Sequence, residues 1–271
     1  MNIAPRGMLL VTYDSCRLDV LRSACTPVLR RYGRLLSAQT PGNFTYPAHQ
    51  AFFVGHLPQA TEDLPYYNRF RKQLLGLQRV GETRVTRDAL IRVGSPINAL
   101  QGLSERGYQV VGTGAMTWFQ LTSLTAGFAD FLYTGVDADA QVEYLLSMLD
   151  VRQPFFAFVN FGETHAPFHH LGKATHCPVD VRAVAMSWPP VERGLVGRAN
   201  PAFDHQVEAA EFLDRRLGRL LNGLPGDTVV VVCSDHGECF GEDGYWGHGF
   251  NHPQVLEVPL AIFRADGELI Q

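Results

Sequence analysis

Residues 228–238 read Thr-Val-Val-Val-Val-Cys-Ser-Asp-His-Gly-Glu, an apolar, β-branched run that ends abruptly in charged residues. The run is continuous rather than alternating, which is typical of a strand covered on both faces of a parallel sheet. An apolar stripe with helical spacing stands just before it, made of Val207, Ala210, Leu213, Leu217, Leu220 and Leu221. The stretch therefore predicts an amphipathic helix followed by a buried strand, with Asp235 and His236 at the strand's carboxyl end.

Similar apolar runs recur along the chain, at residues 8–13, 109–112, 155–161 and 259–263. Helical patterns lie between several of them. Residues 142–149 precede the run at 155, and a helix over residues 96–105 would end before Gly107, a residue well suited to the position after a helix. Strands that alternate with helices predict an α/β fold, with a mostly parallel central sheet and helices on both faces.

Length and composition predict the domain organisation. The chain has 271 residues, of which 46% are hydrophobic and 18% charged, and this fits one large globular domain over residues 1–271. The sequence contains no linker and no internal repeat. Two polar, irregular stretches, residues 58–94 and 169–201, interrupt the alternation and are expected to be excursions from the sheet.

The charge and the cysteine content of the sequence indicate which kind of partner the protein binds and in which cell compartment it is expected. The formal net charge is −4 and the lysines and arginines are scattered, so the sequence has no basic footprint for nucleic acid. The apolar run at residues 8–13 is too short for a membrane span and lacks a signal-peptide cleavage site. The five cysteines are odd in number and show no Cys-x-x-Cys spacing. We expect a cytoplasmic protein that acts on a small molecule.

Charged side chains gather where the expected strands end, at Asp14, Glu163, His165, Asp235 and His236. The carboxyl ends of parallel strands meet in one crevice, which is where ligands bind in open α/β sheets. Carboxylate oxygens and imidazole nitrogens suit Zn²⁺ or Mn²⁺, and we expect one such ion, with two possible. Any of these residues alone would pass for a helix N-cap or a solvated charge, but all of them together would not.

A glycine-rich loop after residue 238 carries two further histidines, His248 and His252. At a turn from strand to loop, the neighbours Asp235 and His236 are able to reach two adjacent positions, and a loop histidine would complete that site. His252 precedes a proline and fits a structural role equally well. His248 is therefore the favoured additional metal ligand.

A candidate nucleophile lies in the segment Asn43-Phe44-Thr45-Tyr46-Pro47-Ala48-His49. An apolar segment follows at residues 51–54, so Thr45 is expected at or near the N-terminus of a buried helix. Backbone N–H groups and the helix dipole favour an anion there. A threonine hydroxyl beside a metal is able to attack phosphorus. Taken alone, the position would be read as an ordinary N-cap.

Several segments together resemble sulfatase-like members of the alkaline phosphatase superfamily: residues 9–19, 26–29, 104–108, 127–128, 233–238 and 258–260. The resemblance implies an alkaline phosphatase-like fold. It implies that Asp14, Thr45, Asp235 and His236 hold one metal, with Thr45 as the nucleophile. A His-x-Pro element at residues 165–167 implies a substrate-side or second-metal role for His165, and His248 stands where a family histidine closes the site.

The departures from the sulfatase pattern bear on the substrate. Sulfatases carry Cys-x-Pro-x-Arg or Ser-x-Pro-x-Arg, whose first residue becomes formylglycine, and threonine cannot form that aldehyde. The element Thr-x-Pro-x-His at residues 45–49 resembles instead the nucleophile segment of nucleotide pyrophosphatase/phosphodiesterases. By that resemblance we expect Asn68 and His49 on the substrate side. Two-metal phosphodiesterases have an Asp and a His four residues apart. Here Glu163 has Pro167 at that spacing, so the sequence does not decide whether a second metal is bound.

The function expected is metal-dependent hydrolysis of phosphate esters, as a phosphodiesterase or a phosphatase. Thr45 would attack phosphorus in line, and water activated by the metal or by His165 would release the phosphate. Three alternatives stay open: phosphoryl transfer to an acceptor other than water, hydrolysis of sulfate esters, and a non-catalytic metal-binding module.

Overall fold

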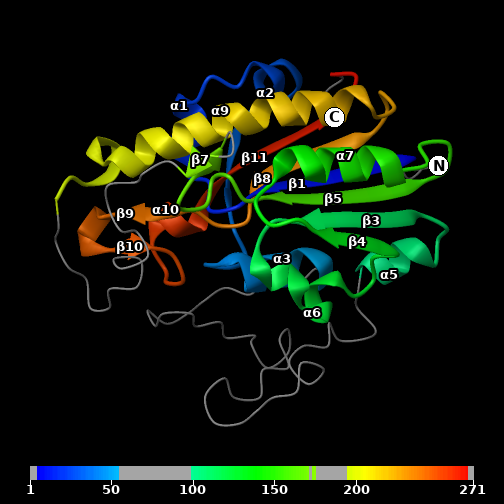
Figure 1. Ribbon diagram of the computed structural model, residues 1–271, viewed down its shortest axis with the longest axis horizontal. Helices are drawn as coiled ribbons and strands as arrows, with labels where there is room; N and C mark the ends of the chain where they lie inside the picture. Colours follow the sequence, from blue (N-terminus) through cyan, green and yellow to red (C-terminus); the bar gives the residue numbers. More distant parts are fainter. Residues whose placement is uncertain (1–4, 55–98, 171–172, 175–193, 268–271) are drawn as a thin grey trace, which may run out of the picture.

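The computed structural model describes residues 5–54, 99–170, 173–174 and 194–267, and its centre is a sheet of seven strands (Figure 1). The strand order is β2-β11-β8-β1-β5-β3-β4. The strands are β1 (Gly7–Tyr13), β2 (Leu36–Gln39), β3 (Gln109–Gly114), β4 (Asp130–Tyr133), β5 (Phe155–Phe161), β8 (Val229–Ser234) and β11 (Glu257–Arg264).

The sheet is parallel apart from β11, which runs antiparallel to both β8 and β2. The central strand β1 lies between β5 and β8, and all three end at the same level. Tyr13 is in register with Phe161 on one side and with Ser234 on the other. The residues that follow these strand ends are therefore delivered to one place.

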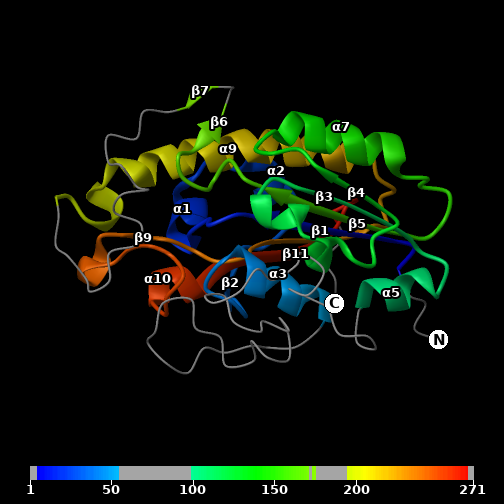
Figure 2. The same ribbon diagram turned by 60° about the horizontal axis from the view of Figure 1, so that its bottom comes forward.

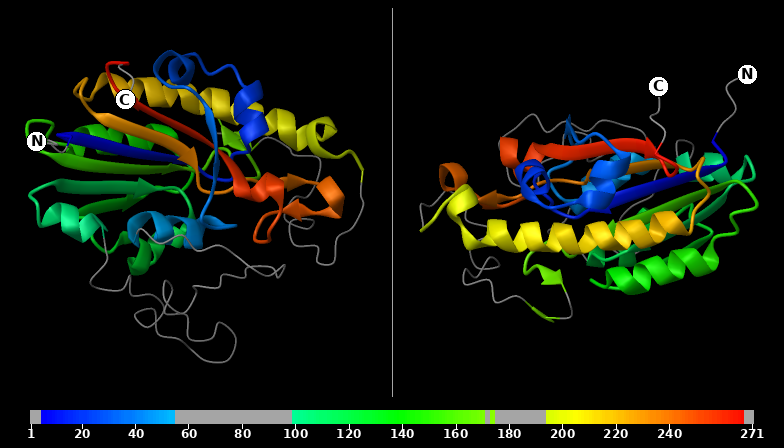
Figure 3. Two further views of the ribbon diagram at one scale, coloured as in Figure 1. Left: turned by 180° about the vertical axis from the view of Figure 1, so that it is seen from behind. Right: turned by 90° about the horizontal axis from the view of Figure 1, so that it is seen from above.

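Helices cover both faces of the sheet (Figures 2 and 3). One face packs against α1 (Leu18–Ser23), α2 (Pro27–Tyr32), α7 (Ala138–Met148) and α9 (Pro201–Asn222). The other face packs against α3 (Thr45–Val54), α5 (Ala99–Ser104), η2 (Thr117–Gln120) and α6 (Thr122–Thr125). The remaining elements are β6 (His169–His170), β7 (Lys173–Ala174), η3 (Gly197–Ala199), β9 (Cys239–Phe240), η4 (Glu242–Gly244), β10 (Trp246–Gly247) and α10 (Pro253–Leu256).

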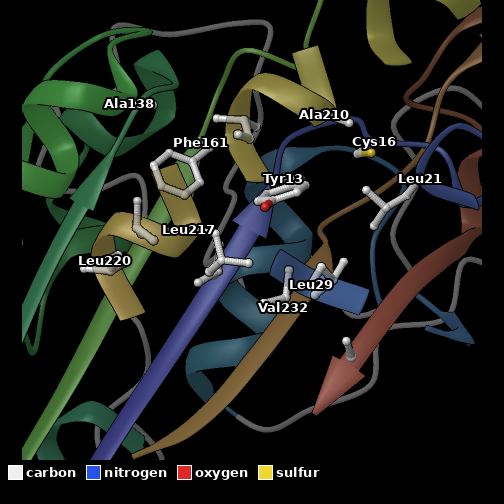
Figure 4. Packing of buried hydrophobic residues seen from close by; sticks show 14 of the residues in the cluster. Tyr13, Cys16, Leu21, Leu29, Ala138, Phe161, Ala210, Leu217, Leu220 and Val232 are labelled. Atoms are coloured by element: carbon white, nitrogen blue, oxygen red, sulfur yellow. The ribbon is translucent and has the colours of Figure 1, made fainter. Parts of the chain in front are cut away.

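The long helix α9 contributes the largest share of the apolar side chains that the helices pack against the sheet. It begins at Pro201, directly after Asn200, whose side chain accepts a hydrogen bond from Ala202 N. Its apolar stripe packs on the sheet, and Leu217 and Leu220 belong to the same core cluster as Phe161 (Figure 4). Each fully buried leucine of this kind is worth about 1.5–3 kcal/mol of transfer free energy, so the stripe holds the helix firmly in place.

The mostly parallel α/β architecture expected from the sequence is confirmed. The five apolar runs form β1, β3, β5, β8 and β11. Strands β2 and β4 were not predicted, because each has only four residues, none of them buried, and neither forms a continuous apolar run.

The two expected excursions lie largely outside the described residues. All of 58–94 falls there, as does most of 169–201. Within the described part of the latter, residues 169–170 pair with 173–174 in a short antiparallel ladder. Among the helices that the structure describes, none is long and apolar enough to cross a membrane.

Candidate active site

Three buried polar side chains meet at the carboxyl ends of β1 and β8. Asp14 follows β1, and Asp235 and His236 follow β8; all three side chains are fully buried. One ligand atom from each lies within 4.8 Å of the other two, which makes this the one group of potential metal ligands in the described part of the chain. Nε2 of His236 is 3.8 Å from Asp14 Oδ1 and 3.5 Å from Asp235 Oδ2.

A hydrogen bond to the backbone determines which ring nitrogen of His236 carries the proton. Nδ1 of His236 lies 3.0 Å from the carbonyl oxygen of Gly237, which only a protonated nitrogen is able to bind. Nε2 therefore carries the lone pair and faces the two carboxylates. Metal-binding histidines are held in this way, with the second ring nitrogen donating to a carbonyl.

The pKa values of the two buried carboxylates, Asp14 and Asp235, are shifted in opposite directions. Burial, and then the negative charge of Asp14, raise the pKa of Asp235 well above its usual range. For Asp14 the effect of burial is outweighed by nearby His165, His236 and His49 and by a hydrogen bond from Asn160, so its pKa is lowered. Oδ2 of Asp235 has no hydrogen-bond partner although it is buried. A divalent cation among these atoms would satisfy that oxygen, so the donor set fits Zn²⁺ or Mn²⁺.

Thr45 is the first residue of α3, and its hydroxyl faces the same cluster. The Thr45 side chain is buried, and its Oγ1 is 3.3 Å from Asp14 Oδ2 and 3.4 Å from His236 Nε2. The expected proximity of this hydroxyl to the metal ligands is therefore present. The helix places it there because Gly42 packs its backbone against Ala48, where a Cβ on Gly42 would lie 2.5 Å from Ala48 N.

The turn after β1 is clamped by a glutamine from α9. Ser15 adopts φ 60°, and its backbone N–H donates to Asp235 Oδ1 at 3.1 Å. Nε2 of Gln206 donates to the carbonyl oxygens of Ser15, at 3.0 Å, and Thr164, at 2.8 Å. These bonds hold a strained backbone turn against the helix that spans the core.

Two more histidines and a glutamate line one side of the cluster. The ring of His248 lies 4.4 Å from that of His236 and 5.3 Å from that of His165, centroid to centroid. Burial lowers the pKa of His248, but Glu238, whose Oε1 is 3.6 Å from His248 Nδ1, outweighs it and raises the pKa. His248 and His165 thus stand beside the cluster, and His248 is not one of the three grouped ligands.

His252, the other histidine of the loop, has a structural role. It is the N-cap of α10, where its Nδ1 accepts a hydrogen bond from Gln254 N at 3.1 Å, and its Nε2 is 3.2 Å from Asp243 Oδ2. That His248 rather than His252 binds the metal stays a prediction.

Two residues expected in the site, Glu163 and His49, are held by contacts of their own. Glu163 accepts a hydrogen bond from Ala138 N, at 2.7 Å, and so binds the N-terminus of α7 instead of the metal-ligand group. Burial raises its pKa to about 7. His49 is fully buried among Phe52, Phe53, Phe119 and Phe158, and its Nδ1 lies 3.7 Å from Asp235 Oδ2. Asn68 lies outside the described residues.

Sequence reasoning missed two polar residues that support Asp14. Nδ2 of Asn160 lies 3.1 Å from Asp14 Oδ2 and 3.1 Å from Thr12 Oγ1. Both residues sit inside buried strands, β5 and β1. An asparagine within the run Phe-Phe-Ala-Phe-Val-Asn-Phe is the available signal, because a buried amide requires partners.

A family model described as Sulfatase matches residues 94–269. Choline-sulfatase of Rhizobium meliloti (strain 1021) is 22% identical over 287 residues, covering 86% of this chain and 56% of the relative. The chain thus spans just over half the length of that curated relative.

Two solved structures share the fold over nearly the whole chain. The C-terminal periplasmic domain of EcEptC from Escherichia coli, in complex with Zn, gives a TM-score of 0.58 at 13% identity and covers 98% of this chain and 74% of that one. BT1596, a 2-O GAG sulfatase, gives a TM-score of 0.62 at 15% identity and covers 98% of this chain and 66% of that one. Similarity at this level of identity speaks for the fold.

Proposed function

The chain belongs to the sulfatase family, and from that premise we propose that it hydrolyses phosphate esters with the hydroxyl of Thr45 as nucleophile and a divalent cation as cofactor. The family and the alkaline phosphatase-like fold support a hydrolase or a transferase of this superfamily. That the substrate is a phosphate ester and that Thr45 is the nucleophile is our own inference.

One observation carries the proposal. The residue that faces Asp14 and His236 from the first turn of α3 is a threonine, with Oγ1 3.3 Å and 3.4 Å from their nearest atoms. A threonine cannot be converted to the aldehyde on which sulfatases depend. The hydroxyl itself is thus left as the nucleophile, and its position next to a donor set for a cation suits that role.

The chain's own groups account for the first half of the reaction. A divalent cation held by Asp14, Asp235 and His236 would lower the pKa of the Thr45 hydroxyl and neutralise charge on the phosphoryl oxygens. Oγ1 of Thr45 gives up its proton to solvent and forms a bond to phosphorus while the bond from phosphorus to the ester oxygen breaks. The ester oxygen leaves with the electron pair and takes a proton from solvent, and the phosphoryl group remains on Thr45.

His165 is suited to the second half. Its Nδ1 lies 2.7 Å from the carbonyl oxygen of Ala166 and must carry the proton, so Nε2 is the free acceptor. The ring lies beside that of His248 at the edge of the cluster. Nε2 would take a proton from water as the water oxygen bonds to the phosphorus on Thr45. The bond from phosphorus to Oγ1 breaks, and Oγ1 takes the proton back from Nε2, which restores the hydroxyl and releases phosphate, or a phosphate monoester when the substrate is a diester.

Charge favours phosphate over sulfate at such a site. A phosphate monoester carries more negative charge than a sulfate monoester, and a cation with buried donors stabilises that charge as it redistributes. Discrimination by a factor of about 100 requires about 2.7 kcal/mol of differential transition-state stabilisation.

We predict that metal-loaded protein cleaves nitrophenyl phosphate, or a nitrophenyl phosphodiester, with kcat/KM at least about 100-fold above that for nitrophenyl sulfate. The measurement is steady-state release of nitrophenol from the three esters on one preparation, before and after removal of the metal with a chelator. Activity that depends on the metal and favours either phosphate ester supports the proposal.

The other outcomes separate the alternatives. Sulfate as the best of the three esters would contradict the role given to Thr45. Faster nitrophenol release on addition of an alcohol, with a phosphorylated alcohol as product, would indicate a transferase. No turnover of any of the esters by protein that binds the metal would indicate a non-catalytic module.

A further inference from the structure

A chain of buried hydrogen bonds connects the helix that carries Thr45 to the carboxylate of Asp14. His49 lies one helical turn after Thr45 on α3, with Nδ1 2.7 Å from the Thr45 carbonyl oxygen and Nε2 3.0 Å from Thr12 Oγ1. Asn160 Nδ2 is 3.1 Å from Thr12 Oγ1 and 3.1 Å from Asp14 Oδ2. One helix and two neighbouring strands thus contribute to a single network.

Each bond in this network has one allowed direction. A carbonyl oxygen only accepts, so His49 donates through Nδ1 and its Nε2 is an acceptor. The hydroxyl of Thr12 therefore donates to Nε2, and its oxygen accepts from the Asn160 amide. That amide also donates to Asp14 Oδ2, because its oxygen would be repelled there by the carboxylate. At one end of the network the Asn160 amide donates to Asp14, and at the other end His49 donates to the carbonyl oxygen of Thr45.

The environment of His49 supports this assignment. The side chains of Thr12, His49 and Asn160 are all fully buried. Burial lowers the pKa of His49 to about 4, which agrees with a neutral ring that donates at one nitrogen and accepts at the other. The ring is wedged among four phenylalanines, so it has little freedom to turn. A buried polar network in which each direction is determined gives a unique geometry.

We propose that Thr12, His49 and Asn160 are positioning residues that set the distance and orientation between the Asp14 carboxylate and the Thr45 hydroxyl. None of the three contacts substrate; they act through Asp14 and through the backbone of Thr45. The inference rests on the proposed function to the extent that Asp14 binds the cation and Thr45 attacks phosphorus. It extends that function by assigning the residues that align the two.

The test replaces the middle of the network without changing its shape. Thr12→Val removes the hydroxyl that His49 and Asn160 share, and Thr12→Ser restores it. We expect Thr12→Val to lower kcat for nitrophenyl phosphate and the affinity for Mn²⁺ about 10–100-fold each, the usual range for groups that orient metal ligands. KM should stay within about threefold of wild type, since no substrate contact is lost. Thr12→Ser should recover most of both losses.

A matched control separates positioning from general damage to the core. Gln50 is equally buried on the same helix, but its Nε2 donates to Tyr46 Oη at 2.9 Å, away from Asp14. Gln50→Leu should change the melting temperature while leaving kcat and Mn²⁺ affinity within about threefold of wild type. If Thr12→Val does not fold, Asn160→Asp is the second variant. It has the same shape, places an acceptor against Asp14, and should lower Mn²⁺ affinity to a similar extent.

The measurements are Mn²⁺ affinity by chelator competition, kcat and KM on loaded protein, and melting temperature without metal. The inference is overturned if Thr12→Val retains both affinity and kcat, or if Gln50→Leu loses as much as Thr12→Val. It is also overturned if wild-type protein binds no metal. Wild-type protein that binds Mn²⁺ but turns over no ester would defeat the proposed function alone, because the affinity comparison still tests the alignment of Asp14.

Discussion

Thr45→Ala is expected to lower kcat/KM for phosphate esters by a factor of about 10³ or more while leaving the fold and the bound metal in place. Loss of a catalytic nucleophile commonly has an effect of this size. The fold should survive because alanine favours a helix and the change removes only two heavy atoms from the start of α3. Ligand atoms from Asp14, Asp235 and His236 remain within 4.8 Å of one another without the threonine.

The measurement is steady-state hydrolysis of nitrophenyl phosphate, with metal content determined on the same sample. Thr45→Ser is the matched variant: it retains a hydroxyl at the start of α3 and should keep activity within about tenfold of wild type, a difference of about 1.4 kcal/mol. Near-wild-type turnover by Thr45→Ala would mean that water attacks phosphorus directly.

Asp235→Asn is expected to remove metal binding without unfolding the protein. The amide oxygen of asparagine still accepts the bonds from Ser15 N and His236 N that Asp235 Oδ1 receives. The negative charge that the cation needs is lost, so affinity should fall by more than the 10–100-fold typical of groups that only orient ligands.

The loss of metal binding in Asp235→Asn should also change the free energy of unfolding. In wild-type protein at neutral pH, metal at about 100 times its dissociation constant should add about 2.7 kcal/mol to the free energy of unfolding, and Asp235→Asn should lose this increment. Without metal the sign reverses. Burial and the charge of Asp14 raise the pKa of Asp235, so ionising it opposes folding above its unfolded pKa. The metal-free variant should therefore melt no lower than metal-free wild type.

The measurement is thermal melting with and without Zn²⁺ or Mn²⁺, together with metal content. His252→Ala is the control, because His252 belongs to the same loop but caps α10. That variant should lose about 1 kcal/mol of stability and keep its metal. Wild-type metal content in Asp235→Asn would refute the assignment of Asp235.

The sequence was sufficient for the fold and for the residues at the strand ends, for a physical reason. Continuous apolar runs mark β1, β5 and β8 as buried parallel strands, and parallel strands deliver their next residues to one edge. Asp14, Asp235 and His236 meet there. Glu163 follows β5 in the same way but turns to the N-terminus of α7, because sequence position near a strand end does not determine the direction of a side chain.

The hydrogen-bond network of Thr12, His49 and Asn160 around Asp14 could not be predicted in this way. His49 and Thr12 are 37 positions apart in the chain, and they meet only because α3 packs on the face of the sheet to which Thr12 points. His49 was expected on the substrate side from its place in the Thr-x-Pro-x-His element, and that element gave no sign of its packing among phenylalanines. A contact between residues that are distant in sequence depends on tertiary packing, which a motif does not specify.

The stereochemical course at phosphorus tests the central claim most directly. The substrate is a nitrophenyl thiophosphate made chiral at phosphorus with oxygen isotopes, and it is hydrolysed in water that carries a third isotope. Attack by Thr45 followed by attack by water inverts the phosphorus twice, so the account predicts net retention of configuration. Net inversion would mean a single in-line displacement by water, and it would contradict a covalent role for Thr45.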